Sequence, residues 1–134
     1  IEGLYPVVTA KENFDDLLIP ADHPSRSEKD SYYGDDAHEF LLRTHTSAHQ
    51  TDFLKQGNRR FLITGDVYRR DEIDRFHYPV FHQVEGVCVG GDEENLKEKM
   101  EQMVVDVFGD INYRFVDSYF PFTNPSWELE IELD

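Results

Sequence analysis

The stretch from residue 60 to residue 89, RFLITGDVYRRDEIDRFHYPVFHQVEGVCV, has the pattern of two β-strands joined by a charged loop. Both ends of the stretch are rich in β-branched and aromatic residues, which favour strands. In and beside the loop, basic and acidic side chains are mixed, although the chain as a whole carries a formal net charge of −15. The basic residues are Arg69, Arg70, Arg75 and His77, and the acidic ones are Asp66, Asp71, Glu72 and Asp74. The mixture predicts an anion site in which the loop's own acids hold its basic side chains in place.

Alternation along the two strands predicts which side chains share a face. Phe81, Gln83 and Glu85 point to one side of the second strand, and Gly65 and Arg69 share a face of the first. A ring, an amide and a carboxylate in a row suit a ligand that carries a flat ring and an ammonium group, and Gly65 leaves room for it. Arginine can hold a phosphate through two hydrogen bonds. The alternative is a surface hairpin with exposed ion pairs, each worth about 0–1 kcal/mol.

Composition limits the class of protein. A chain of 134 residues is one domain or part of one, and its 39% hydrophobic and 13% aromatic content predicts a folded protein despite the charge. The negative charge opposes contact with a nucleic-acid backbone over most of the surface. The single cysteine, Cys88, excludes an intrachain disulfide and a cysteine-based zinc site. No apolar run approaches the roughly 20 residues of a membrane span. We therefore expect a soluble intracellular protein that does not bind membranes.

The other segments predict an α+β fold, with mostly antiparallel pairing and helices on one side. We expect a short helical or extended element near residues 13–19, a strand at 39–44, and strands at 112–122 and 127–133. A short helix at 46–58 would have Thr46 or Ser47 as its cap and Gly57 as its stop. A longer helix would begin after Asp92 and end at Gly109. Its apolar residues at helical spacing are Leu96, Met100, Met103, Val104, Val107 and Phe108. The segment GGDEEN is a candidate low-complexity joint, and an insertion could be missing near residues 89–92.

Two further patterns leave alternatives open. His45 and His49 are four residues apart, a spacing that some metal sites use, but no carboxylate completes a ligand set, so no metal site is predicted. Phe120 and Phe122 flank a proline and are either a packed core pair or a slot for an aromatic ligand. The sequence has no glycine-rich phosphate loop, which excludes the P-loop and Rossmann modes of nucleotide binding.

Three segments in register resemble a known family. LLRTHTSAHQ, GDVYRRDEID with HYPVFHQVEG, and YFPFTNPSWELEI are similar to the catalytic domain of phenylalanyl-tRNA synthetases, which are class II aminoacyl-tRNA synthetases. NFDDLLIPADHPSR and DSYYGD resemble the single-chain organellar form more than the bacterial α subunit. The resemblance implies an antiparallel sheet with flanking helices. It also implies activation of phenylalanine by ATP, supplied as its Mg²⁺ complex, and transfer of phenylalanine to tRNA(Phe).

The resemblance also implies roles for individual residues. Arg69 would clamp the α-phosphate of ATP, His77 would reach the outer phosphates, and Phe81 would stack on adenine. Asp71 stands where most class II enzymes place a glutamate that faces the adenine amino group. Arg69 and His77 would be the catalytic residues. The amino-acid substrate would contact His45, Ser47, Gln83 and Glu85 through its ammonium and carboxylate, and Phe120 and Phe122 through its ring.

We expect residues 1–134 to form part of a class II catalytic domain, with the second conserved motif at about 61–89 and with the third motif and the anticodon-binding domain absent. Such a piece would be inactive alone and would meet tRNA mostly through other regions. Its type predicts a mitochondrial or other organellar location, with the cytoplasm as the alternative. An alternative function is a synthetase-like module that binds an amino acid and a nucleotide without catalysis.

Overall fold

The computed structural model describes residues 3–132, and the chain divides into two compact units, which are treated separately below. The first unit ends at Cys88 and the second begins at Val89. In chain order, the elements of the first unit are β1 (Val7–Thr9), α1 (Ala10–Asn13), η1 (Asp15–Leu17), η2 (Pro24–Arg26), β2 (Phe40–Leu42), η3 (Thr46–His49), α2 (Gln50–Lys55), β3 (Arg60–Tyr68) and β4 (Val80–Cys88), where η marks a 3₁₀ helix. The elements of the second unit are α3 (Glu93–Phe108), β5 (Tyr113–Asp117) and β6 (Trp127–Ile131).

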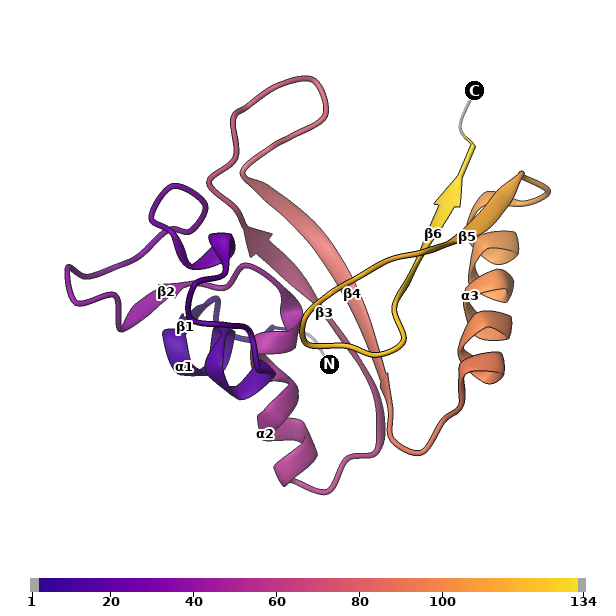
Figure 1. The fold of residues 1–134 in the computed structure, drawn as a ribbon, viewed down its shortest axis with the longest axis horizontal. Helices are drawn as coiled ribbons and strands as arrows, with labels where there is room; N and C mark the ends of the chain where they lie inside the picture. The colour runs from indigo at the N-terminus through magenta and orange to yellow at the C-terminus, as the bar shows by residue number, and fades with distance from the viewer. Residues whose placement is uncertain (1–2, 133–134) are drawn as a thin grey trace. The chain divides into compact units, whose positions relative to one another are not determined.

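The strands confirm the predicted α+β class and antiparallel pairing. β3 and β4 form the long hairpin predicted from residues 60–89, with Arg60 opposite Cys88 and Tyr68 opposite Val80 (Figure 1). β1 pairs with β2, and β5 pairs with β6. Within residues 3–132 the strands thus form three two-stranded antiparallel sheets.

The first helix begins earlier than predicted because its N-terminus is capped. The side chain of Thr9 accepts a hydrogen bond from the backbone N–H of Glu12, and Glu12 Oε2 accepts one from the N–H of Thr9 at 2.7 Å. This capping box satisfies two backbone donors at the helix start. A 3₁₀ turn follows and ends at Leu18, whose φ of 61° is left-handed. The element expected at 13–19 therefore starts at Ala10.

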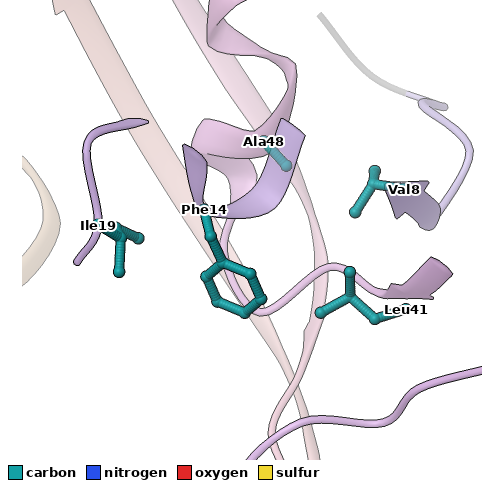
Figure 2. Close-up of a cluster of buried hydrophobic side chains, with 5 residues drawn as sticks. All are labelled: Val8, Phe14, Ile19, Leu41 and Ala48. Carbon is teal, nitrogen blue, oxygen red and sulfur yellow. The ribbon is translucent and has the colours of Figure 1, made fainter. Parts of the chain in front are cut away.

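The core of the first unit joins segments far apart in the sequence. Its buried side chains are Val8, Phe14, Ile19, Leu41 and Ala48 (Figure 2). The guanidinium of Arg26 covers the ring of Phe14, with Cζ 4.9 Å from the ring centroid. Because Ala48 belongs to η3, burial of these residues fixes the turn that carries His45, Thr46 and Ser47.

The second unit contains the predicted long helix. Asp92 caps α3 by accepting a hydrogen bond from the N–H of Asn95 at 2.8 Å, and Gly109, at φ 77°, ends it. Of the predicted apolar positions only Val104 is buried, whereas Met103 and Val107 are at least half exposed. Lys97 joins α3 to the strand pair, with Nζ 4.3 Å from the ring centroid of Trp127.

The two C-terminal strands differ from their predicted ranges. β5 stops at Asp117, well before the predicted end at residue 122, because Asp117 pairs with Trp127 and residues 118–126 form the connection between the two strands. In β6, Trp127 and Ile131 are partly buried, and the glutamates between them are exposed, as the alternation predicts. Leu133, which belonged to the predicted alternation, lies outside the described residues.

Replacing Phe14 by alanine tests the core. Phe14 is 1% exposed, so Phe14→Ala should lower the free energy of unfolding by about 3–5 kcal/mol through lost burial and the cavity left behind. Leu18→Ala is the matched control, because Leu18 is 77% exposed. This substitution should change the free energy of unfolding by about 0.5 kcal/mol or less. Urea denaturation followed by circular dichroism measures both, and equal losses would contradict the assigned core.

Candidate functional site

A polar cluster lies between η3 and β4, centred on the carboxylate of Glu85. Thr46 Oγ1 donates to Glu85 Oε2 at 3.0 Å, and the hydroxyl of Ser47 bonds to the same oxygen. Gln50 Nε2 donates to Glu85 Oε1 at 2.6 Å. The two hydroxyls therefore do not cap the helix. The predicted cap at Thr46 or Ser47 is wrong, because His45 takes the N-cap position of η3 and makes no side-chain cap bond.

Gln83 lies beside Glu85 on the same face of the hairpin. Its Oε1 accepts a hydrogen bond from the backbone N–H of Thr46 at 2.9 Å, with Thr46 Oγ1 at 3.4 Å. This contact turns the amide nitrogen away from Thr46, where it can donate to another group. The predicted alternation in β4 is confirmed, because Gln83 and Glu85 are partly buried while His82 and Val84 are exposed.

His45 is the least satisfied polar side chain of the cluster. Both ring nitrogens are buried and neither makes a hydrogen bond of normal geometry. Burial lowers the pKa of His45 to about 4, although the nearby Glu85 carboxylate acts in the opposite direction. The imidazole is therefore neutral at pH 7, with one N–H to donate and one nitrogen to accept. The backbone of Asn13 lies near the ring, but neither nitrogen is fully satisfied, and such a buried polar ring is uncommon and indicates a place where a ligand would complete the bonding.

Arg69 and Phe81 lie next to this cluster. The guanidinium of Arg69 stands over the ring of Phe81, with Cζ 5.2 Å from the ring centroid. Arg69 Nε donates to the backbone carbonyl of Thr44 at 3.2 Å, which ties the arginine to the residue before His45. The structure thus brings six of the predicted site residues together: His45, Ser47, Arg69, Phe81, Gln83 and Glu85.

Asp71 and His77 lie in the loop that extends beyond the ends of β3 and β4 (Figure 1). His77 Nδ1 is 2.9 Å from Asp74 Oδ1, and this hydrogen bond raises the pKa of His77. No hydrogen bond or ion pair joins Asp71 or His77 to Arg69 among residues 3–132. The loop is thus held to the site only through its ends.

The predicted pairing of the loop's arginines with its acids is wrong. Arg69 and Arg70 donate to backbone carbonyls, those of Thr44 and Glu28. Of the loop acids, Asp74 orients a basic side chain, and that side chain is His77. The arginine charges therefore remain without a carboxylate partner in the hairpin loop, which leaves Arg69 able to meet an anion.

Phe120 and Phe122 belong to the second unit and lie in the loop between β5 and β6. Their ring centroids are 6.0 Å apart with an angle of 31° between the planes. Each is more than a third exposed, so they are not a buried core pair. Phe120 lines a surface hollow formed by this loop, together with Tyr119, Pro121 and Trp127.

Three further residues contribute to the site but were not among the predicted site residues. Thr46 and Gln50 belong to the THTSAHQ segment, but their contacts to Glu85 depend on how η3 packs on β4. Arg43 is buried, and its Nη1 lies 2.9 Å from His49 Nε2. His49 therefore faces a cation, an arrangement that does not suit joint metal binding with His45.

The sequence pattern of the tRNA synthetases class II core domain (F) matches residues 4–134. The chain belongs to this family, and its relatives are phenylalanine–tRNA ligases. It is 54% identical to the chloroplastic/mitochondrial enzyme of Arabidopsis thaliana, over 97% of this chain and 33% of that protein. It is 45% identical to the mitochondrial enzyme of Mus musculus, over 97% of this chain and 37% of that protein. The α subunit of Prochlorococcus marinus (strain MIT 9312) is 43% identical, over 90% of this chain and 35% of the subunit.

The chain thus spans about a third of the length of these curated relatives. Enzymes with the class II core use ATP and Mg²⁺ in general. Among the described residues, no helix combines the length and apolar character that crossing a bilayer requires.

The burial of His45 predicts a pH-dependent stability. The pKa is about 4 in the folded chain against 6.5 ordinarily, so between these values the unfolded chain holds more protons. The free energy of unfolding that depends on a neutral His45 is fully present above pH 6.5. It falls as the pH drops towards 4, by at most about 3 kcal/mol.

Urea unfolding of the chain and of His45→Gln at pH 7 and pH 4.5 measures this effect. The variant should lose less stability on acidification than the unsubstituted chain. Gln56→Ala is the control, since Gln56 is exposed and has no titratable side chain, so its replacement should leave the pH dependence unchanged. The same acid loss in all three proteins would exclude a buried neutral His45.

Proposed function

We propose that this chain carries the amino-acid site and part of the ATP site of a phenylalanine–tRNA ligase. The enzyme would join phenylalanine and ATP into an aminoacyl-adenylate and transfer the amino acid to tRNA(Phe). The observation that carries this proposal is the Glu85 carboxylate, which is held by two hydroxyls and an amide beside a neutral, unsatisfied His45. The family membership and the names of the relatives support the same activity.

The amino-acid end of the substrate would meet groups of matching chemistry. The ammonium would donate to Glu85, which is the carboxylate among the grouped residues, and to the Ser47 oxygen. The substrate carboxylate would accept from the amide nitrogen of Gln83 and from the N–H of His45. Glu85 is already held by hydrogen bonds before the ligand arrives. Binding therefore costs little additional conformational entropy of this side chain.

Phe120 and Phe122 would bind the phenyl ring edge-to-face. Support for this role comes from the resemblance of the YFPFTNP segment and from the exposure of both rings. Rings in such an arrangement contribute about 0.5–1.5 kcal/mol beyond the area that they bury.

The nucleotide would bind beside Arg69. Its guanidinium would clamp the α-phosphate, and adenine would stack on the face of Phe81 that Arg69 does not cover. His77, whose pKa is raised by Asp74, would contact the outer phosphates as a cation, and Asp71 would face the adenine amino group. The Mg²⁺ ion would arrive as part of the ATP complex.

The chemistry would need no general base from the protein. The carboxylate oxygen of phenylalanine attacks the α-phosphorus, a new P–O bond forms, and the bond to pyrophosphate breaks. Negative charge grows on the α-phosphate oxygens as the phosphorus becomes pentacoordinate, and Arg69 would neutralise it. The Glu85 and Gln83 contacts would hold the nucleophile in line, so catalysis is mainly positioning and charge neutralisation.

Residues 1–134 would then be part of a class II catalytic domain, with the second conserved motif at about 61–89. The β3–β4 hairpin supports that position of the motif. The tRNA would be met mostly by other regions of the enzyme. The organellar names of the relatives favour a mitochondrial or plastid location over the cytoplasm.

Replacing Arg69 tests the catalytic role. In the complete protein, phenylalanine-dependent exchange of pyrophosphate into ATP should fall about 10²–10³-fold in Arg69→Ala, because one positioned donor to the transition state is lost. Arg59→Ala, on the exposed approach to β3, should keep full activity. Unchanged exchange in the Arg69 variant, or equal exchange with tyrosine, would refute the proposal. Phenylalanine binding without any exchange would instead favour a binding module without catalysis.

Replacing Glu85 tests the ammonium site. Glu85→Gln keeps the shape of the side chain but removes its charge, and should weaken phenylalanine binding by about tenfold or more, since bonds to charged groups contribute roughly 1.5–3 kcal/mol. Isothermal titration calorimetry of the complete protein measures this change. Glu72→Gln, in the exposed loop, is the control and should bind phenylalanine normally. An unaffected Glu85 variant would remove the carboxylate from the proposed site.

A further inference from the structure

Arg43, which directly follows β2, is a buried cation without a directly bonded carboxylate partner among the described residues. It is 3% exposed, and no ion pair to it is present among residues 3–132. Its hydrogen bonds go to neutral acceptors: Nε donates to the carbonyl of Asp66 at 2.7 Å, and Nη1 donates to the carbonyl of Leu4 at 3.3 Å and to His49 Nε2 at 2.9 Å. Burial lowers the pKa of the Arg43 guanidinium, and the Asp66 carboxylate acts on it only at a distance. Burial of a charge without a directly bonded carboxylate is costly, so the position needs an explanation other than stability.

The guanidinium occupies the space that Gly65 leaves open. A Cβ atom on Gly65 would overlap Arg43 Nη2 and would lie 3.1 Å from Cζ. The backbone of Gly65 is not in the left-handed region, so its conformation does not demand glycine. The prediction that Gly65 leaves room for a ligand is therefore wrong, because the Arg43 guanidinium fills that space. Gly65 stands opposite Gln83 in the hairpin, which puts the guanidinium beside the proposed amino-acid site.

Arg43 also holds both ends of the turn that lines this site. Its own carbonyl accepts from the N–H of Tyr68 at 3.0 Å, which fixes the start of the turn to the end of β3. Its side chain bonds His49, the last residue of η3. Between these two points the chain carries His45, Thr46 and Ser47 across Gln83 and Glu85. A shift of Arg43 would therefore move every side chain that the turn presents.

We propose that Arg43 is a positioning residue for phenylalanine, seated on Gly65 and bonded to His49. It fixes the turn at residues 44–49 against β3, so that His45 and Ser47 face the substrate while Gln83 and Glu85 hold their orientation. Arg43 itself does not touch the substrate. This inference rests on the proposed function, since it assigns a task within the same site.

A double-mutant cycle in the complete protein tests the inference. Gly65→Ala should raise the KM for phenylalanine in the exchange reaction about tenfold to a hundredfold, because displacement of a positioning group by about 1 Å has effects of that size. The KM for ATP should rise by a smaller factor, because Arg69 meets the turn through the backbone carbonyl of Thr44 and not through a side chain that the turn presents. Arg43→Met should raise the KM for phenylalanine similarly. The double variant should be no worse than Arg43→Met alone, because the methyl group then meets no guanidinium.

Gly86→Ala is the matched control. Gly86 lies in the partner strand of the same hairpin, and a Cβ there would meet only the end of the Leu62 side chain, at 3.3 Å. The KM of the Gly86→Ala variant for phenylalanine should stay close to that of the unsubstituted protein. Melting curves of all variants, recorded by circular dichroism, report whether they are folded.

If Gly65→Ala does not fold, Arg43→Lys replaces it. A lysine ammonium cannot reach the acceptors of Leu4, Asp66 and His49 with the fork geometry of arginine, so the KM for phenylalanine should still rise several-fold. Normal KM values for phenylalanine in folded Arg43 and Gly65 variants would overturn the positioning role alone. If the effects of the two substitutions on the KM for phenylalanine were additive in the double variant, the proposed contact between Arg43 and Gly65 would be overturned. Absence of phenylalanine-dependent exchange in the unsubstituted protein would instead overturn the proposed function.

Discussion

The carboxylate of Glu85 sets the position of the turn that faces β4. Its two oxygens accept from two hydroxyls and one amide, all carried by residues 46–50. A carboxylate that bonds three donors of one segment holds that segment against the strand, and the buried Ala48 in the same turn anchors it from the other side. Arg69 and Gln83 then follow, because Arg69 Nε donates to the carbonyl of Thr44 at the start of the turn and Gln83 Oε1 accepts from the N–H of Thr46. The geometry of the proposed amino-acid site thus depends on a negative charge that the turn itself orients.

Local patterns predicted most of the secondary structure, and tertiary contacts account for what was missed. The hairpin at residues 60–89 and the helix after Asp92 were correct because alternation and capping act over a few residues. The capping box at Thr9 was equally local but was not recognised. β5 is shorter than predicted because residues 118–126 form the connection to β6. Helical spacing in α3 did not predict burial, since spacing shows which residues share a face but not whether another element covers it.

The candidate site was predictable in its residues and not in its bonds. The alternation in β4 placed Phe81, Gln83 and Glu85 together, and the structure agrees. The sequence could not show that Thr46 and Ser47 turn to Glu85 rather than to their own helix, since either bond satisfies a hydroxyl. Nor could it show that the space at Gly65 is filled by Arg43, twenty-two positions earlier in the sequence. The roles of all the predicted site residues, the grouped ones as well as Asp71, His77, Phe120 and Phe122, remain predictions based on the family resemblance.

The hydroxyl of Thr46 carries one hydrogen and has two acceptors within reach, Glu85 Oε2 at 3.0 Å and Gln83 Oε1 at 3.4 Å. It can serve only one of them at a time. When an incoming ammonium group donates to Glu85, rotation about the Cβ–Oγ1 bond can transfer the hydrogen of Thr46 to Gln83. The bonding can then adjust between an empty and a filled site by the turn of a single O–H bond, without movement of any heavier atom. Valine at this position would preserve the shape of the turn and abolish that rotation.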